Sequence, residues 1–130
     1  MTTPDYIEVA DYEAQAREFL AQSRNFLAQG NLHQASEKGW GAAAHMAKAV
    51  ASAQGWEYRN HSDFSDVLYQ ARRLTGNADL RGLRSIANEL HINYYKRKRH
   101  LNAQSIGEDI ESVAEMLEIL YPLTGLDGES

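Results

Sequence analysis

The sequence contains no cysteine and only two prolines in 130 residues. Without cysteine, the chain can form no disulfide, no thiolate zinc site and no cysteine nucleophile. The prolines are Pro4 and Pro122, so no residue between them forbids a continuous helix. No stretch approaches the roughly 18 consecutive apolar residues of a membrane span, and the first residues lack the basic and apolar regions of a signal peptide. We therefore expect a cytoplasmic protein without a membrane segment.

Several catalytic and metal-binding motifs are also missing. The chain has five histidines, but no His-Glu-x-x-His pair and no histidine with a carboxylate at helical spacing on an apolar stripe. It has no glycine-rich phosphate loop, no nucleophile elbow and no paired carboxylates of the kind that hydrolyse sugars. We expect no dedicated metal site and no cofactor.

What the chain does contain is a regular helical pattern that glycines interrupt. A length of 130 residues, of which 43% are hydrophobic, suits one domain with its own core. Apolar side chains recur every three to four residues and predict five helices, at residues 11–29, 32–54, 63–74, 79–100 and from 105 up to Pro122. Gly30, Gly55 and Gly76 follow the first three helices, where a left-handed cap ends a helix.

Short connections between long amphipathic helices favour antiparallel neighbours. The predicted fold is therefore all-α, an up-and-down antiparallel bundle of four long helices plus one shorter helix. We expect a single domain at residues 11–122, with flexible segments at residues 1–10 and 123–130. The polar residues expected to cap the third, fourth and fifth helices are Ser62, Asn77 or Asp79, and Ser105.

The middle of the second helix consists mainly of small residues around one large anchor, Trp40. Glycine is about 1 kcal/mol less favourable than alanine in a helix interior, so Gly39 and Gly41 need a packing reason. We expect another helix to approach closely here.

Charge is spread unevenly along a chain whose net charge is −5. Between Arg81 and His100 there are six Arg or Lys residues against one acid, Glu89, whereas the chain after His100 has seven acids and no Lys or Arg. One interpretation is structural: the basic helix and the acidic helix are antiparallel neighbours with complementary faces. The other is functional: the basic segment is an anion-binding strip.

The fourth predicted helix carries a polar stripe formed by Arg84, Asn88, His91 and Tyr95. Spacings of four, three and four keep these residues on one face, and the Cα atoms of Arg84 and His91 lie roughly 10 Å apart. A neighbouring apolar stripe supplies the face that is expected to be buried, and it consists of Leu80, Leu83, Ala87, Leu90 and Tyr94.

An arginine and a histidine at this spacing suit phosphodiester chemistry. A guanidinium offers permanently charged donors that fit phosphate oxygens, and an imidazole can take or give a proton near neutral pH. In RNA the adjacent 2′-hydroxyl can act as the nucleophile, so that cleavage needs no metal. The alternative interpretation is a solvated or interface stripe without chemistry.

Residues 84–91, which begin with Arg84 and end with His91, resemble the Arg, four to six residues, His motif of the HEPN domain superfamily. The continuation at residues 90–95 is similar to that of short, stand-alone prokaryotic members. Residues 35–45 are similar to the Glu-, Trp- and Ala-rich second helix of such proteins. The resemblance covers about Tyr12 to Leu120.

The resemblance implies a HEPN-like homodimer in which motif residues of both chains meet in a cleft. In active members it implies a metal-independent endoribonuclease of toxin or defence type, in which Arg84 would contact the scissile phosphate and His91 would be the acid or base. The residues expected to guide the RNA are Asn88, Tyr95, Lys96, Arg97 and Arg99. The alternative is a non-catalytic bundle that binds a nucleotide or a partner protein, such as a nucleotidyltransferase antitoxin, through the same face.

Overall fold

The structure is a computed structural model and describes residues 4–127. This part of the chain folds into five α-helices and two short 3₁₀ helices without a strand, so the all-α prediction is confirmed. The α-helices are α1 (Tyr6–Ala28), α2 (Leu32–Gln54), α3 (His61–Thr75), α4 (Asp79–Asn93) and α5 (Ala103–Leu120). The 3₁₀ helices are η1 (Lys98–His100) and η2 (Tyr121–Thr124).

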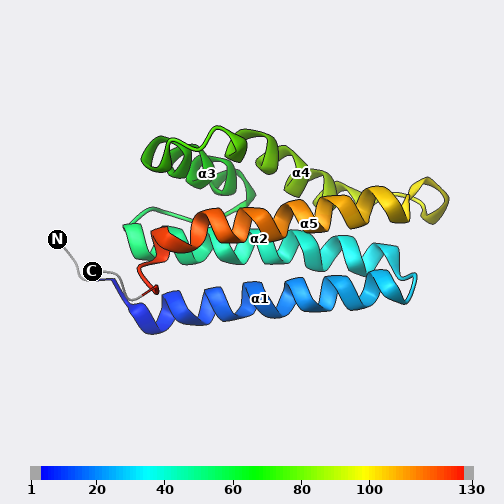
Figure 1. The fold of residues 1–130 in the computed structure, drawn as a ribbon, viewed down its shortest axis with the longest axis horizontal. Helices are drawn as coiled ribbons and strands as arrows, with labels where there is room; N and C mark the ends of the chain where they lie inside the picture. Colours follow the sequence, from blue (N-terminus) through cyan, green and yellow to red (C-terminus); the bar gives the residue numbers. More distant parts are fainter. Residues whose placement is uncertain (1–3, 128–130) are drawn as a thin grey trace.

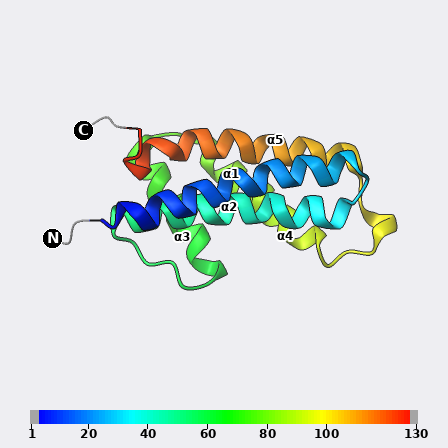
Figure 2. The ribbon, with the colours of Figure 1, turned by 90° about the horizontal axis from the view of Figure 1, so that it is seen from below.

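Helix α2 lies at the centre of the bundle. It packs against α1, α3, α4 and α5, whereas α1 packs against α2 and α5. Figure 1 shows the three long helices α1, α2 and α5 side by side, with α3 and α4 on the side of α2 and α5 that is opposite α1. Figure 2, seen from below, shows the same arrangement with α3 and α4 behind the three long helices. The pair α3 and α4 therefore covers one side of the bundle.

The small residues of α2 let its neighbours approach closely, as predicted. Gly39 is fully enclosed, and a Cβ atom added to it would lie 3.0 Å from a Cδ1 atom of Leu90 in α4 and 3.4 Å from Cγ1 of Ile110 in α5. Eleven residues of α2 are buried, most of them alanines. The missing side chain of Gly39 thus sets how near α4 and α5 come to α2.

Helix α1 begins at Tyr6, five residues earlier than predicted. The Asp5 side chain caps it, since Oδ1 accepts hydrogen bonds from the backbone N–H groups of Ile7 at 3.0 Å and Glu8 at 3.1 Å. Val9 in the first turns is fully buried. In the segment 1–10, which we expected to be flexible, residues 6–10 are therefore helical and Val9 is part of the core, and residues 1–3 lie outside the described part.

The predicted tail at residues 123–130 also contributes to the fold. Helix η2 continues directly from α5, Thr124 is fully buried, and Leu123 and Leu126 pack against the core. The Thr124 hydroxyl donates a 2.6 Å hydrogen bond to the Tyr121 carbonyl, which fixes this turn. Residues 128–130 lie outside the described part.

Helix α4 ends at Asn93 and does not reach His100 as predicted. The backbone N–H groups of Tyr94, Tyr95 and Lys96 donate hydrogen bonds to the carbonyls three residues earlier, as in a 3₁₀ helix. The backbone is extended at Arg97. No residue from 94 to 100 is buried, so no packing energy holds four consecutive cationic residues in a helix. We call residues 94–102, which contain this basic run and η1, the basic loop.

The predicted serine caps of α3 and α5 are wrong by a few residues. Asn60 caps α3 and Asn102 caps α5, and their side chains accept hydrogen bonds from the backbone N–H groups of Ser62 at 3.0 Å and Ser105 at 2.9 Å. The asparagine stands two residues before Ser62 and three residues before Ser105, and Asn is at least as good an N-cap as Ser. At α4 the N-cap is Ala78, without a side-chain cap bond, and not Asn77 or Asp79 as predicted. The Asn77 side chain, one residue earlier, accepts a 2.9 Å hydrogen bond from the N–H of Asp79.

The acidic face of α5 forms its ion pairs with α1, which corrects the structural interpretation of the charge pattern. Arg24 of α1 pairs with Glu111 at 2.8 Å, and Arg17 pairs with Glu118 at 2.6 Å. Within residues 4–127, the basic loop contributes one ion pair, from Lys96 to Glu89 of α4 at 2.8 Å. The acidic residues of α5 that form these ion pairs therefore neutralise arginines of α1 and not the cations of the basic loop.

Candidate functional site

The polar stripe of α4 lies against the first half of α3. The Asn88 side chain and His61 Nε2 are 3.0 Å apart, and the Arg84 guanidinium donates a 3.3 Å hydrogen bond to the Ser65 hydroxyl. His61 and Ser65 are four residues apart in α3, so they share a face and match the spacing of Arg84 and Asn88. Arg84, Asn88 and His91 are therefore half-buried in an interface within the chain.

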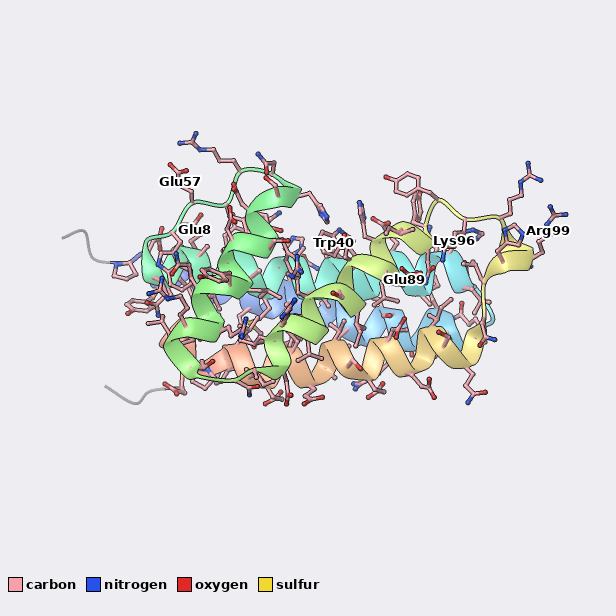
Figure 3. The ribbon with its side chains drawn as sticks, turned by 90° about the horizontal axis from the view of Figure 1, so that it is seen from above. Glu8, Trp40, Glu57, Glu89, Lys96 and Arg99 are labelled. Carbon is pink, nitrogen blue, oxygen red and sulfur yellow. The ribbon has the colours of Figure 1, made fainter. Side chains whose placement is uncertain are left out.

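His91 belongs to a cluster of three aromatic rings. Its imidazole stacks on that of His61, with ring centroids 4.9 Å apart and an interplanar angle of 26°. The Trp40 indole contacts both rings, at 4.7 Å from His61 and 4.9 Å from His91. Figure 3 shows Trp40 between the beginning of α3 and α4. Trp40, the anchor noted in the sequence, thus holds two histidines from different helices together.

The three rings line a cavity of about 550 Å³, which we call the histidine cavity. Other residues on its wall come from α1, from α2 and from the connection between α2 and α3. They include two lysines, one acid, a tyrosine and a third histidine, namely Lys38, Lys48, Glu37, Tyr58 and His45. The volume is in the range of small-molecule sites, roughly 300–1,000 Å³.

Burial shifts the pKa values of two titratable groups on this wall, His45 and Tyr58. Burial lowers the pKa of His45 and Lys48 lowers it further, although Nδ1 hydrogen bonds to the Gly41 carbonyl at 2.9 Å. Burial, together with the nearby Asp63, raises the pKa of Tyr58 to about 12. At neutral pH the Tyr58 hydroxyl therefore keeps its proton. Lys38, Lys48 and Arg59 supply permanent positive charge on the wall.

The Nδ1 atom of His91 is buried and has no hydrogen-bond partner among the described residues. Native proteins leave few buried polar atoms unpaired, and catalytic sites are one place where such atoms persist. The stacked ring also meets the edge of Tyr95, with centroids 5.7 Å apart. His91 is thus enclosed on several sides and still lines the histidine cavity.

Arg84 lines a second cavity, of about 390 Å³, between α3 and α4. We call it the arginine cavity. Its wall consists of three arginines, one acid and several apolar or hydroxyl side chains, namely Arg72, Arg81, Arg84, Asp66, Ser65, Leu68, Tyr69 and Leu80. Within one chain, Arg84 and His91 therefore line different cavities, although they share a face of α4.

Of the other predicted substrate residues, Asn88 lies on α4 and the rest lie on the basic loop, and none of them lines either cavity. Asn88 touches His61, as described, and the Tyr95 side chain is 73% exposed beside His91. Lys96 is held by Glu89, whereas Arg97 and Arg99 are exposed on the basic loop. Figure 3 shows Arg99 projecting away from the bundle beyond the end of α4.

Residues 11–117 match the model of the archaeal PaREP1/PaREP8 family. The chain belongs to this family. Comparisons with curated proteins and with solved structures give no significant match. The match runs from α1 through most of α5, so both cavities and the basic loop lie within the part that the PaREP1/PaREP8 model covers.

Three residues of this PaREP1/PaREP8 protein that build the two cavities were not predicted as site residues. His61 and Ser65 lie on α3 and contact the predicted stripe, and Trp40 was expected only as a packing anchor. Their contacts with α4 depend on how α3 docks, which local periodicity does not encode. A usable signal was the helical spacing of His61 and Ser65, which matches that of Asn88 and Arg84 on the next helix.

Nowhere in residues 4–127 do three or more His, Asp or Glu side chains come together in an arrangement that could hold a metal ion. Likewise, none of the helices in that range combines the length and apolar character required to cross a bilayer.

Proposed function

We propose that this protein is a HEPN-like homodimer that binds RNA and cleaves it without a metal ion, as a nuclease of toxin or defence type. The observation that carries the proposal is the stacked pair of His61 and His91 on the wall of the histidine cavity. The exposed cations of the basic loop follow His91 in the chain and supply attraction for the phosphate backbone.

Two neighbouring imidazoles meet the chemical needs of RNA cleavage. The 2′-oxygen attacks the adjacent phosphorus while its proton passes to a base, and the bond from phosphorus to the 5′-oxygen breaks while an acid protonates that oxygen. The products are a 2′,3′-cyclic phosphate and a 5′-hydroxyl. His91 and His61, with centroids 4.9 Å apart, can divide the two proton transfers between them.

Arg84 has a phosphate-binding role in this proposal. Because it lies two helical turns before His91 on the same face of α4, an RNA strand that follows α4 meets both residues at different phosphates. Tyr95 is well exposed and offers a ring on which an unpaired base can stack. Exposed apolar side chains at the end of α4, Ile92 and Tyr94, support a contact between two copies.

The test is cleavage of single-stranded RNA by the purified protein with a chelator present. We expect His91→Ala to slow cleavage about 100-fold or more, since general acid–base groups contribute about 10²- to 10⁴-fold. Arg84→Ala should also slow it strongly, through the loss of a charge-assisted phosphate contact. Light scattering should show that both variants remain dimers.

The matched control is Arg73→Ala, which changes an exposed arginine outside both cavities and outside the basic loop. It should cleave like the unmodified protein. The proposal is rejected if no RNA of varied sequence is cut, or if cleavage persists unchanged in His91→Ala.

A further inference from the structure

The Asn88 side chain of α4 contacts His61 of α3 and does not itself line the histidine cavity. Its Oδ1 atom lies 3.0 Å from Nε2 of His61. An amide oxygen has no proton to give, so the hydrogen of this bond comes from the imidazole. The contact therefore places a proton on Nε2 of His61.

Three aromatic rings hold the plane of the His61 ring. The ring centroids of Trp40 and His91 lie 4.7 Å and 4.9 Å from that of His61. Phe64 is stacked at 6.5 Å with an interplanar angle of 15°. These contacts set the plane of the imidazole, and the bond to Asn88 selects which of its nitrogens points towards α4.

The other nitrogen of His61 is available to a molecule in the histidine cavity. A neutral imidazole that carries its proton on Nε2 has a lone pair on Nδ1. Within residues 4–127, Nδ1 of His61 has no hydrogen-bond partner, and His61 is exposed and lines the cavity. His91 has the opposite arrangement, because its Nδ1 is buried and Nε2 is left as the nitrogen that can meet a substrate.

We propose that Asn88 is a positioning residue, which keeps His61 in the tautomer with its proton on Nε2 and so makes Nδ1 of His61 the base for the 2′-hydroxyl. This inference rests on the proposed RNA cleavage and assigns its two proton transfers. Nδ1 of His61 takes the 2′ proton while the 2′-oxygen bonds to phosphorus. Charged His91 gives its Nε2 proton to the 5′-oxygen while the bond from that oxygen to phosphorus breaks. The two stacked rings thus hold one positive charge between them before and after the step.

The bond to Asn88 becomes stronger during this step. When His61 takes the proton, it becomes a cation, and the hydrogen bond from its Nε2 becomes charge-assisted, which makes it about twice as strong as a neutral one. Asn88 therefore stabilises the protonated base in addition to setting its tautomer. This role differs from the sequence-based expectation that Asn88 guides the RNA by direct contact.

Nitrogen NMR measures the tautomer without RNA. Long-range correlation spectra of ¹⁵N-labelled protein, in mildly alkaline buffer where imidazole is neutral, distinguish a protonated from an unprotonated ring nitrogen. We expect His61 to carry its proton on Nε2, with its signals assigned by their loss in His61→Ala. In Asn88→Leu, which removes the acceptor, signals of both tautomers should appear. Asn88→Asp keeps an acceptor and should keep the proton on Nε2.

Cleavage kinetics show whether the tautomer matters for the reaction. Asn88→Leu should lower kcat about tenfold or more with little change in KM, whereas loss of a direct RNA contact would raise KM. In His61→Ala, the addition of Asn88→Leu should have no further effect, because Asn88 acts through His61. The matched control is Asn25→Leu, the same substitution at an exposed asparagine of α1. It should change neither the His61 signals nor the cleavage rate.

The proposal is overturned if His61 carries its proton on Nδ1, if Asn88→Leu leaves the tautomer unchanged, or if Asn88→Leu raises KM and leaves kcat as it was. Normal cleavage by His61→Ala would also overturn it. If the protein cuts no RNA, the proposed function and the role of Nδ1 as a base both fall, and the spectrum alone decides whether Asn88 fixes the tautomer. Circular dichroism checks that every variant keeps its helices.

Discussion

Two glycines in helices have opposite surroundings, and the difference decides what a methyl group would do at each. A Cβ atom at Gly39 would lie 3.0 Å from Leu90, 3.3 Å from the Ser23 hydroxyl and 3.4 Å from Ile110. At Gly82, in exposed α4 surface, it would meet nothing within 4 Å. The intrinsic gain in helix propensity is the same at both positions, about 1 kcal/mol.

We therefore expect Gly39→Ala and Gly82→Ala to change the free energy of unfolding in opposite directions. Overpacking a close-packed core costs about 1–3 kcal/mol, which exceeds the propensity gain, so Gly39→Ala should destabilise the fold. Gly82→Ala should stabilise it by about 0.5–1 kcal/mol. Urea unfolding measures both. Stabilisation by Gly39→Ala would show that α2 and α4 pack less tightly than the structure indicates.

At the scale of single residues, the sequence predicted the α4 side of the contacts between α3 and α4, but not the residues of α3 that face it. Helical spacing places Arg84, Asn88 and His91 on one face, and they do share it. The residues that face them come from another helix and depend on its rotation and tilt. A single sequence contains the period of each helix but not the docking angle between two helices, so the stacking of His61 on His91 could not be predicted.

At the scale of elements, the end of α4 is the largest difference between expectation and structure. The helical pattern continues through the sequence to His100, but burial stops at Asn93. Where caps decide an end, as at Gly55 and Gly76, the sequence predicted the end correctly because both glycines adopt left-handed conformations. Where only loss of packing decides it, local sequence gives no comparable signal.

The basic loop gives a prediction about salt. If the cations of the basic loop contact RNA phosphates, replacing Lys96, Arg97 and Arg99 by serine should weaken RNA binding similarly for different sequences. The plot of log affinity against log salt concentration should become shallower by up to about two units, since each phosphate contact on a single strand contributes about 0.7. Fluorescence anisotropy over a salt series measures this slope.

Arg73→Ser is the control for this series, since it removes an exposed cation far from the loop in sequence. It should leave the salt slope unchanged. An unchanged slope in the triple variant would mean that the basic loop does not contact the RNA.

At the scale of the whole molecule, the five helices contribute unequally to the core. Eleven residues of α2 are buried, whereas α3 buries four, namely Phe64, Val67, Leu68 and Ala71. Helix α3 is also at the side of the bundle opposite α1 (Figure 1). The arginine cavity has one wall on this less buried helix, and the histidine cavity takes His61 from it, which is common for binding surfaces.

We expect amide hydrogen exchange to separate these parts. Amides of α2 should exchange only through global unfolding, and amides of α3 should exchange through openings of lower free energy, because fewer buried apolar groups hold that helix. Exchange measured by mass spectrometry on peptides from the two helices checks this. Equal protection of α2 and α3 would show that the bundle opens as one unit.

The two described ends of the chain lie at the same pole of the bundle. A Cβ atom on Gly125 would lie 3.2 Å from the Tyr6 ring, and Figure 1 shows both ends opposite the basic loop. A tether or a fluorescent protein attached at either end would therefore leave the opposite pole accessible to a large polymer. The molecule can be immobilised by one end without covering the surface at which RNA would first arrive.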